Sequence, residues 1–426
     1  MSISKKFKLI IITGIITILG MLLIFNLKNP QKEVHYKIDA IDSIQSEHFA
    51  RVLSDLMGPP LTSGNKVLGL YNGEQIFPAM LKAIESAQKT ITFESYIYWS
   101  GDIGKKFSDA LSARARAGVK VHVLVDWVGS TKIDEAYVAE MKEAHVEVER
   151  YHALSWYNLS RLNNRTHRKI LVVDGRIGFT GGVGIADEWN GNGLKSDQWR
   201  DTHFQVEGPV VAQMQAAFMD NWLKLRPEVH QAPEYFPVLE PQGESYAQMF
   251  KSSSGEGGSS VRLMYLLAIA SARKSIYLES AYFIPDSQTI DDLVKARARG
   301  VEVQIIVPGP YTDSIVVRHA SRGQWEKLLQ AGVKFFEYQP ALFHCKVLII
   351  DQYFVSVGST NFDERSFRLN DEANLNILDA DFASKEYQAF VEDLKRSKVV
   401  TLEAWMARPK KDKIIEKISA LMHSQL

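Results

Sequence analysis

The chain lacks the features that mark several common classes of protein. Cys345 is the only cysteine in 426 residues, which excludes an intramolecular disulfide. Fifty basic residues balance fifty acidic ones, so the net charge gives no support to non-specific nucleic-acid binding, and we expect no nucleic-acid partner. No group of histidine, cysteine and carboxylate residues has the spacing of a metal site, so we expect no metal or other cofactor. The composition is that of a globular protein of two or three domains.

One long stretch near the N-terminus carries no charge. Residues 9–27 are nineteen in number and read LIIITGIITILGMLLIFNL. As a helix at about 1.5 Å per residue they extend about 28 Å, close to the thickness of bilayer hydrocarbon. A cleaved signal peptide is the alternative, but no A-x-A-like site follows. We expect residues 1–36 to form a single-pass transmembrane anchor and tether in the cell membrane. An excess of one lysine before the span does not decide on which side the remaining chain lies.

Two segments of the chain are repeated. Residues 83–95 match residues 268–280, at an offset of 185. Residues 113–121 match residues 295–303, with a glycine in each copy offset by 182. Offsets that drift this slowly indicate one duplicated fold with small insertions and deletions.

Each repeat alternates predicted helices and strands. Gly118 and Gly300 stand where a helix should end, and a predicted strand begins directly after each. Strands that alternate with helices predict an α/β sandwich. We expect two tandem α/β/α sandwich domains related by a pseudo-two-fold axis, residues 37–240 and 241–400, joined near the glycine- and serine-rich residues 252–260.

The pattern H-x-K-x-x-x-x-D occurs once in each repeat. The residues that define it, which we take as the catalytic set, are His167, Lys169 and Asp174 in the first copy and His344, Lys346 and Asp351 in the second. Each copy lies in a predicted buried strand, where residues two apart share a face, so each histidine lies beside its lysine. An imidazole next to an ammonium group suits a phosphate. The aspartates fall on the opposite face, so we expect them to orient the motif rather than contact substrate.

The second copy continues with further polar side chains. Ser359 and Asn361 again share a face, so a hydroxyl and an amide can join the site. Glu372 follows, and a carboxylate can accept the ring N–H of a histidine and strengthen it as a nucleophile. By the same alternation of faces, Cys345 points away from the phosphate and is expected to be a packing residue.

The C-terminal tail, residues 401–426, allows two interpretations. Its apolar residues fall at helical spacing with lysines among them, namely Ile414, Ile415, Ile418, Leu421 and Met422 with Lys410, Lys411, Lys413 and Lys417. One interpretation is a basic amphipathic helix on anionic lipid. The other, which we favour, is a helix docked on the preceding domain.

The two motifs and the residues around them resemble a known family. The paired H-x-K-x-x-x-x-D motif is that of the phospholipase D superfamily. Residues 164–169, 199–201 and 358–367 are similar to bacterial cardiolipin synthases, and the likeness covers about residues 65–400. The resemblance implies a metal-independent transfer of a phosphatidyl group between two phosphatidylglycerol molecules, with release of glycerol. Phospholipids and the membrane are the implied partners.

The same resemblance implies roles for the site residues. His167 forms a phosphatidyl-histidine, and His344 protonates the leaving alcohol and then deprotonates the incoming one. Lys169, Lys346, Ser359 and Asn361 hold the phosphate, and Glu372 orients a histidine across the interface.

The first half departs from this pattern, and other functions stay open. Gly182 and Gly184 stand where the second half has Ser359 and Asn361, so the first half offers fewer phosphate donors. Asp201 is the expected first-half counterpart of Glu372 as a substrate-site carboxylate. The alternatives are a phospholipase D that hydrolyses phospholipids to phosphatidic acid, a phosphodiesterase or nuclease, and a non-enzymatic membrane scaffold.

Overall fold

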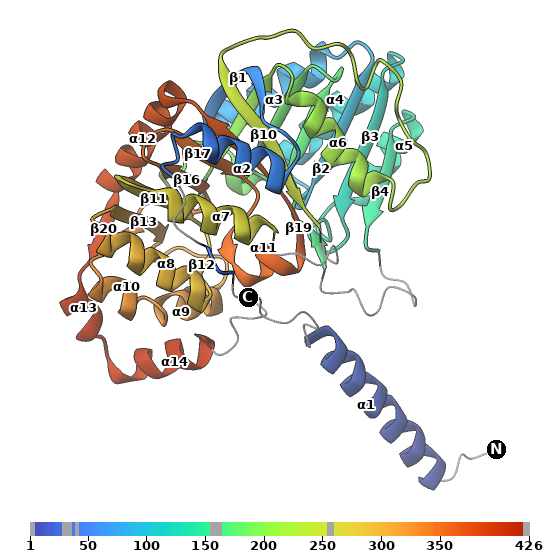
Figure 1. Cartoon of the computed structure of the whole chain (residues 1–426). Coiled ribbons are helices and arrows are strands. Elements are labelled where there is room, and N and C mark those ends of the chain that lie inside the picture. The colour runs from blue at the N-terminus through green and yellow to red at the C-terminus, as the bar shows by residue number, and fades with distance from the viewer. Residues whose placement is uncertain (1–4, 28–35, 39–41, 154–163, 254–259, 421–426) are drawn as a thin grey trace.

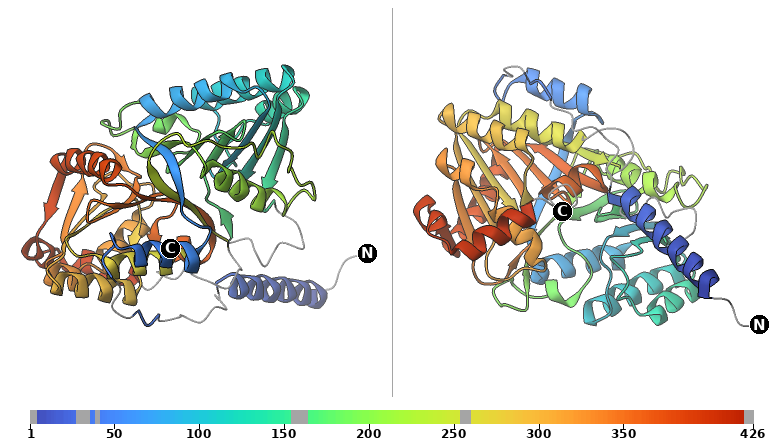
Figure 2. Two further views of the ribbon diagram at one scale, coloured as in Figure 1. Left: turned by 45° about the horizontal axis from the view of Figure 1, so that its top comes forward. Right: turned by 90° about the horizontal axis from the view of Figure 1, so that it is seen from below.

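The computed structural model describes residues 5–27, 36–38, 42–153, 164–253 and 260–420 (Figure 1). Its body consists of two halves that contribute to one continuous β-sheet. The halves meet at β1 (Thr62–Tyr71) and β10 (Ser245–Ser252), which pair antiparallel. Figure 2 shows the halves side by side with these two strands between them.

The order of strands outward from the central pair is the same in both halves. Beyond β1 lie β9 (Thr202–Glu207), β7 (Ile177–Gly181), β6 (Ile170–Val173), β2 (Thr90–Ser95), β3 (Lys120–Asp126) and β4 (Glu147–Tyr151). Beyond β10 lie β19 (Asn370–Leu378), β17 (Phe354–Gly358), β16 (Lys346–Ile350), β11 (Ser275–Ser280), β13 (Glu302–Pro308), β14 (Lys334–Tyr338) and the edge strand β20 (Ser397–Val400). The predicted α/β class and the predicted duplication are therefore confirmed.

Helices cover both faces of this sheet. In the first half they are α3 (Gly73–Ser86), α4 (Asp102–Arg116), α5 (Glu135–Glu143) and α6 (Val211–Trp222). In the second half they are α7 (Ser260–Ser271), α8 (Ser287–Ala298), α9 (Ile315–Arg322), α10 (Glu326–Gln330), α11 (Glu364–Arg368) and α12 (Ala380–Lys395). A further short pair of parallel strands, β12 (Phe283–Ile284) and β18 (Phe362–Asp363), lies off the main sheet.

The strands that carry the repeated motif are buried on both faces. In β6, Leu171 and Val173 pack in the core formed with α3 and α4, whereas Ile170 and Val172 pack with α6. Side chains of a strand alternate between the two faces, so a strand covered on both sides is apolar throughout.

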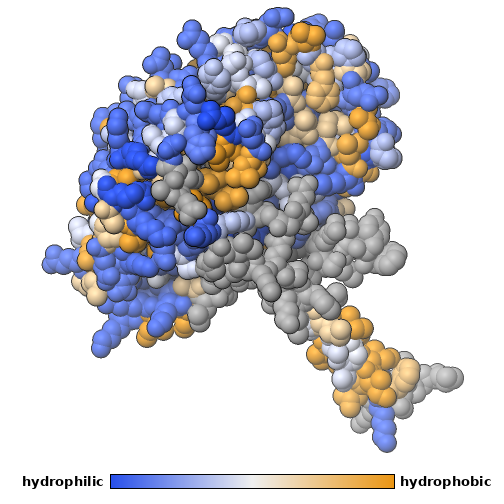
Figure 3. Space-filling model, in the orientation of Figure 1, coloured by the Kyte–Doolittle hydropathy of each residue, from blue (hydrophilic) through white to orange (hydrophobic). Residues whose placement is uncertain are grey.

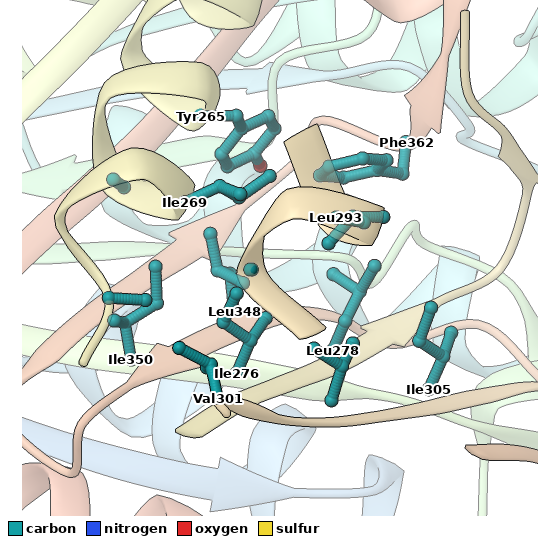
Figure 4. Packing of buried hydrophobic residues seen from close by; sticks show 14 of the residues in the cluster. Tyr265, Ile269, Ile276, Leu278, Leu293, Val301, Ile305, Leu348, Ile350 and Phe362 are labelled. Atoms are coloured by element: carbon teal, nitrogen blue, oxygen red, sulfur yellow. The ribbon is translucent and has the colours of Figure 1, made fainter. Parts of the chain in front are cut away.

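The equivalent strand of the second half is packed in the same way. Leu348 and Ile350 of β16 lie in the core with α7 and α8. Figure 4 shows them facing Ile269 and Leu293 of these helices, beside Ile276 of the neighbouring strand β11. The intervening residues of β16 pack with α12. Each such aliphatic side chain contributes about 1.5–3 kcal/mol on burial, so this packing holds the paired motif firmly in place.

The N-terminal helix α1 (Lys5–Leu27) stands apart from the body (Figure 1). Its apolar side chains are exposed, with Leu9 at 65% and Ile10 at 67%. Among the residues that the structure describes, no helix is both long and apolar enough to cross a membrane. The transmembrane anchor therefore stays a prediction.

Helix α2 (Glu47–Met57) packs with the second half, although it precedes the first half in the chain. Phe49 and Leu53 are buried in the same core as α7, and the Ile44 N–H donates to the carbonyl of Ser271 at 3.3 Å. The predicted boundary at residue 37 groups this helix with the first domain, whereas its apolar contacts join it to the second. Most of the predicted linker, residues 254–259, lies outside the described residues.

The C-terminal tail docks on the second half. It contains α13 (Leu402–Met406) and α14 (Lys410–Ala420), and Glu416 of α14 is buried against Arg322 of α9. A helix docked on the second half can still present its exposed side to lipid, so both interpretations of the tail stay predictions. Leu421 and Met422 lie outside the described residues.

Candidate active site

Two short pairs of strands bring each motif histidine against the opposite half of the chain. β5 (Arg165–Thr166) pairs with the start of β19, and β15 (Leu342–Phe343) pairs with β8 (Trp199–Arg200). The His167 N–H donates to the carbonyl of Asp371 at 2.8 Å, and the His344 N–H donates to that of Arg200 at 2.8 Å. The residue after each of these carbonyls is a carboxylate, so each histidine meets an acid from the other half.

His167 is paired with Glu372. Its Nδ1 lies 3.0 Å from both carboxylate oxygens, and both side chains are buried. Burial lowers the pKa of His167 to about 4, although Glu372 opposes this shift. Burial acts to raise the pKa of Glu372, but His167 and Lys169 outweigh it and the net shift is downward. The pair is therefore a carboxylate and a neutral imidazole that donates from Nδ1, which leaves the lone pair on Nε2.

His344 is paired with Asp201 in the same way. Nδ1 lies 2.7 Å from Oδ2 of Asp201, which also accepts the indole N–H of Trp189 at 2.9 Å. Burial lowers the pKa of His344. The pKa of Asp201 is also lowered, because His344 and Lys346 outweigh the effect of its burial. Lys346 Nζ also lies 3.0 Å from this Nδ1, but the shorter contact with the Asp201 carboxylate favours a proton on Nδ1 of the neutral ring and the lone pair on Nε2.

A steric conflict with Asp201 explains why position 182 is a glycine. A Cβ added to Gly182 would lie 2.2 Å from Oδ1 of Asp201, so a side chain there would displace the carboxylate. In the second half the equivalent Ser359 instead donates to Glu372 at 2.5 Å. Trp189 takes the place of that serine as hydrogen-bond donor to the carboxylate. The sequence comparison missed Trp189 because it has no counterpart in the second repeat.

Ser359 and Asn361 differ in what they contact. The hydroxyl of Ser359 is bonded to Glu372 and to Ala373, and this serine is not among the described residues that line the cavity beside the histidines. Asn361 lines that cavity, and its buried Oδ1 has no hydrogen-bond partner within the described part of the chain. Ser359 therefore supports the carboxylate, and its contact with phosphate stays a prediction, whereas Asn361 presents its amide oxygen to the cavity.

The two lysines of the motif are buried beside the histidines. Lys169 donates to the carbonyl of His167 at 2.7 Å, and Lys346 donates to that of His344 at 2.5 Å. Burial lowers the pKa of Lys169 to about 7 and also lowers the pKa of Lys346. An anionic group beside these amines would favour their charged form. The site is therefore suited to a phosphate.

Both histidines open into one cavity of about 650 Å³ between the halves. Aromatic side chains form much of its wall: Tyr96, Trp99, Trp189, Trp199 and Tyr282. Tyr96 contacts His167 edge to face with ring centres 5.1 Å apart, and Trp199 lies 5.3 Å from His344. Lys132, Arg165 and Arg365 add positive charge around the cavity. Such a cavity can accept a phosphodiester together with apolar groups.

Comparison with known proteins identifies the family of this site. A family model described as "Cardiolipin synthase, PLD-like domain" matches residues 80–222 and 265–394. The chain belongs to this family. It is 34% identical over 366 residues to a cardiolipin synthase of Geobacillus kaustophilus, covering 85% of this chain and 73% of the relative. It is also 34% identical over 389 residues to cardiolipin synthase 1 of Bacillus anthracis, covering 89% and 76%. The predicted membership of the phospholipase D superfamily is confirmed, and the chain is a transferase of that superfamily.

Solved structures support the fold. Phosphatidylserine synthase of Haemophilus influenzae aligns with a TM-score of 0.68 at 13% identity, over 88% of this chain and 99% of that one. A polyphosphate kinase of Porphyromonas gingivalis aligns with a TM-score of 0.53 at 13% identity, over 89% of this chain and 54% of that one. At these identities the likeness concerns the arrangement of the chain alone.

The two aspartates of the motif fix the turns that begin strands β2 and β11. Asp174 accepts the backbone N–H groups of residues 88–90 at 2.7–2.9 Å. Asp351 accepts those of residues 273–275 over the same range of distances. Both aspartates have φ of 52°, which closes the turn after β6 and β16. They are tied to the backbone of the neighbouring strand, in line with an orienting role.

Two groups of possible metal ligands occur among the described residues, both outside this cavity. They are His122, Glu147 and His230, and Glu279, Cys345 and Asp393. In the first group, both ring nitrogens of His122 already have partners, Glu147 at 3.1 Å and Tyr235 at 2.6 Å. In the second group, burial raises the pKa of the Cys345 thiol well above its usual value, and Arg200 pairs with Asp393 at 2.8 Å. Cys345 is thus a buried, protonated thiol, as expected of a packing residue.

Proposed function

We propose that this membrane-anchored chain transfers a phosphatidyl group from one phosphatidylglycerol to another through a phosphohistidine, with release of glycerol. The observation that carries the proposal is the crossed pairing of His167 with Glu372 and of His344 with Asp201 beside one cavity. Two oriented histidines provide a nucleophile and an acid/base for a double displacement at phosphorus. The substrates follow from the relatives, which are named cardiolipin synthases.

In the first step His167 is the nucleophile. Its Nδ1 donates to Glu372 at 3.0 Å, so Nε2 attacks the phosphorus of the first phosphatidylglycerol. The P–Nε2 bond forms while the bond from phosphorus to the glycerol oxygen breaks. The bound phosphodiester is anionic and favours the protonated form of His344. In that form His344 gives its Nε2 proton to the glycerol oxygen, and glycerol leaves. Glu372 stabilises the positive charge that develops on the ring of His167.

In the second step His344 acts as the base. Its neutral Nε2 takes the proton from a hydroxyl of the second phosphatidylglycerol, and Asp201 stabilises the imidazolium that forms. The oxygen attacks phosphorus, the P–Nε2 bond breaks, and cardiolipin is released. His167 is again neutral and His344 again protonated, so both are ready for another cycle.

The phosphate is held by Lys169, Lys346 and Asn361. The phosphodiester carries a negative charge, which raises the pKa of the buried lysines again and keeps their ammonium groups charged. Both ammonium groups then neutralise the non-bridging oxygens and the charge that grows on them in the transition state. With its amide turned so that Nδ2 faces the phosphate, Asn361 donates an N–H to one of these oxygens.

The membrane supplies substrate in this proposal. The exposed apolar side chains along α1, such as Leu9, Ile10 and Ile16, support its insertion into lipid as the anchor. Anchoring keeps the site beside a bilayer that contains phosphatidylglycerol and confines the search for substrate to its surface.

The test is an analysis of lipid products. Purified full-length protein is incubated with phosphatidylglycerol in mixed micelles, and the lipids and water-soluble products are resolved. Equal amounts of cardiolipin and glycerol support the proposal. Phosphatidic acid as the main product identifies a hydrolase that passes the phosphatidyl group to water. Cleavage of a nucleotide diester without turnover of any phospholipid would contradict the lipid assignment.

A further inference from the structure

One surface of the second half displays apolar side chains that no described part of the chain covers. On α14, Ile414 and Ile418 are 60% and 59% exposed. On the adjoining helix α9, Ile315 is 56% and Val316 37% exposed. We call these four residues, together with the lysines of α14, the α9/α14 surface. In Figure 3 apolar and hydrophilic atoms mix at the lower edge of the body, where α14 lies.

Helix α14 docks on the body through its polar side. Glu416 is 2% exposed and pairs with Arg322 at 3.0 Å and with Arg408 at 2.7 Å. Ser419 is buried on the same side. A helix that needs only to cover a soluble domain turns its apolar side inward, and α14 does the reverse. Its polar contacts therefore fix a helix with two of its three isoleucines, Ile414 and Ile418, pointing outward, whereas Ile415 is half-buried.

The docking is close as well as polar. A Cβ added to Gly323, at the end of α9, would lie 2.8 Å from the carbonyl of Glu416. The absence of a side chain at Gly323 lets the two helices approach within backbone contact. This contact and the two ion pairs of Glu416 set the orientation of α14. The outer side of the helix is therefore held in a fixed orientation towards solvent.

The charge of α14 complements an anionic surface. Lys410, Lys411 and Lys417 are exposed, and among the described residues of the helix they face only one exposed carboxylate, Asp412. The other carboxylate of the helix, Glu416, is buried and neutralised by two arginines. Lysines beside outward isoleucines are the pattern of a helix that lies in the headgroup region of a bilayer.

The surface is connected to the candidate active site. Asp313 lines the cavity of the paired histidines and accepts a hydrogen bond from the hydroxyl of Tyr282, another cavity residue. Helix α9 begins two residues after Asp313, and its first residues are the exposed Ile315 and Val316. Whatever covers the α9/α14 surface therefore also lies beside one wall of the cavity.

We propose that the α9/α14 surface docks on an anionic lipid bilayer, independently of α1, and that it turns the cavity towards that bilayer. The isoleucines enter the boundary between headgroups and acyl chains, and the three exposed lysines contact anionic headgroups. This second membrane contact is separate from the transfer reaction and would act on any lipid substrate.

The test uses a fluorophore that reports the polarity around α14 in the full chain. Ile418→Cys is labelled with an environment-sensitive dye, since the one native cysteine, Cys345, is buried and inaccessible. The labelled protein is reconstituted by α1 into vesicles of phosphatidylcholine alone or of phosphatidylcholine with phosphatidylserine. The matched control is Val238→Cys, 81% exposed, in the segment between α6 and β10 that crosses the top of Figure 1.

We expect a blue shift at position 418 on the vesicles with phosphatidylserine, its loss at high salt, and no shift at position 238. Substitution of glutamine for the three exposed lysines of α14 should abolish the shift. The same change at three exposed lysines of the first half, Lys89, Lys106 and Lys142, should leave it intact.

No shift at 418, or equal shifts on both kinds of vesicle, would overturn the proposal. A shift in detergent that grows with protein concentration would also overturn it and identify a second copy as the occupant. The readout needs no turnover, so it fails or succeeds separately from the transfer reaction.

Discussion

Replacing Glu372 with glutamine should slow formation of the phosphohistidine while leaving the fold intact. The side chain keeps its size, but the ring of His167 loses the carboxylate that lies 3.0 Å from its Nδ1. Both oxygens of Glu372 already accept hydrogen bonds from other side chains, from Ser359 at 2.5 Å and from Asn370 at 3.3 Å. The amide NH2 of a glutamine must face one of these donors or turn towards Nδ1, which would place the imidazole proton on Nε2 and block attack.

The size of the effect follows from the charge that is removed. Two unit charges about 4 Å apart attract by about 4 kcal/mol at an effective dielectric constant of about 20, which is an upper limit for the cation formed on His167. A neutral hydrogen bond in place of a charged one costs roughly 1 kcal/mol, which is the lower limit. The rate of phosphoenzyme formation should therefore fall by between about fivefold and a thousandfold.

The assay is a rapid-quench measurement of phosphoenzyme formation with radiolabelled phosphatidylglycerol at saturating concentration. The matched control is Glu386→Gln, which changes another buried glutamate, one hydrogen-bonded to Tyr71 and outside the cavity of the paired histidines. The control should leave the rate within about twofold, because Glu386 is tied to neither histidine. A rate for Glu372→Gln equal to that of the unaltered protein would refute the role of the carboxylate.

The remaining predictions concern the asymmetry of the site, acid stability and the cysteine. Gly182→Ser copies Ser359 into the first half. It should reduce transfer at least about a hundredfold, because the added Cβ would lie 2.2 Å from Asp201. The control Gly118→Ser should retain transfer in the same lipid assay, because its added Cβ meets open space, although φ is positive there as well. Burial lowers the pKa of His167 to about 4 and those of His122 and His203 to about 3, so the unfolded chain binds more protons below about pH 6.5. Urea midpoints should therefore fall as pH is lowered from about 6.5 to 4, and His203→Gln should flatten that fall; a midpoint unchanged over this range would contradict the assignment. Cys345 should resist thiol reagents until the chain unfolds, and Cys345→Ala should still catalyse transfer. Loss of transfer on modification of the folded protein would show instead that the thiol is needed.

The sequence predicted those features that the duplication repeats. The α/β class, the two halves and the paired histidines and lysines all follow from matching segments, because each half must bury the same strand on both faces. Asp201 could be named as the counterpart of Glu372 only on weaker grounds of spacing. In the structure each carboxylate follows two residues that pair with the opposite half, Trp199 and Arg200 with β15, and Asn370 and Asp371 with β5.

Features without a counterpart in the other half could not be predicted in this way. Trp189 donates to Asp201 as Ser359 donates to Glu372. The two donors do not occupy equivalent positions in the repeats, so an alignment of the repeats does not find Trp189. The hydroxyl of Ser359 turns to Glu372 because a buried carboxylate needs donors, a demand that only the folded arrangement reveals. The packing of α2 on the second half depends on apolar contacts between segments more than 200 residues apart, such as that of Phe49 with Phe354 at 6.0 Å between ring centres.

The site of covalent attachment is the most direct test of the central claim, that His167 carries the phosphatidyl group. The protein is mixed with labelled phosphatidylglycerol, quenched within the first turnover under conditions that preserve phosphohistidine, digested and sequenced by mass spectrometry. The label should be found on His167 and should be absent from His167→Ala. In His344→Ala it should form more slowly but persist, because this variant lacks both the acid of the first step and the base that completes the second. A label on His344, or turnover to cardiolipin by His167→Ala, would contradict the account.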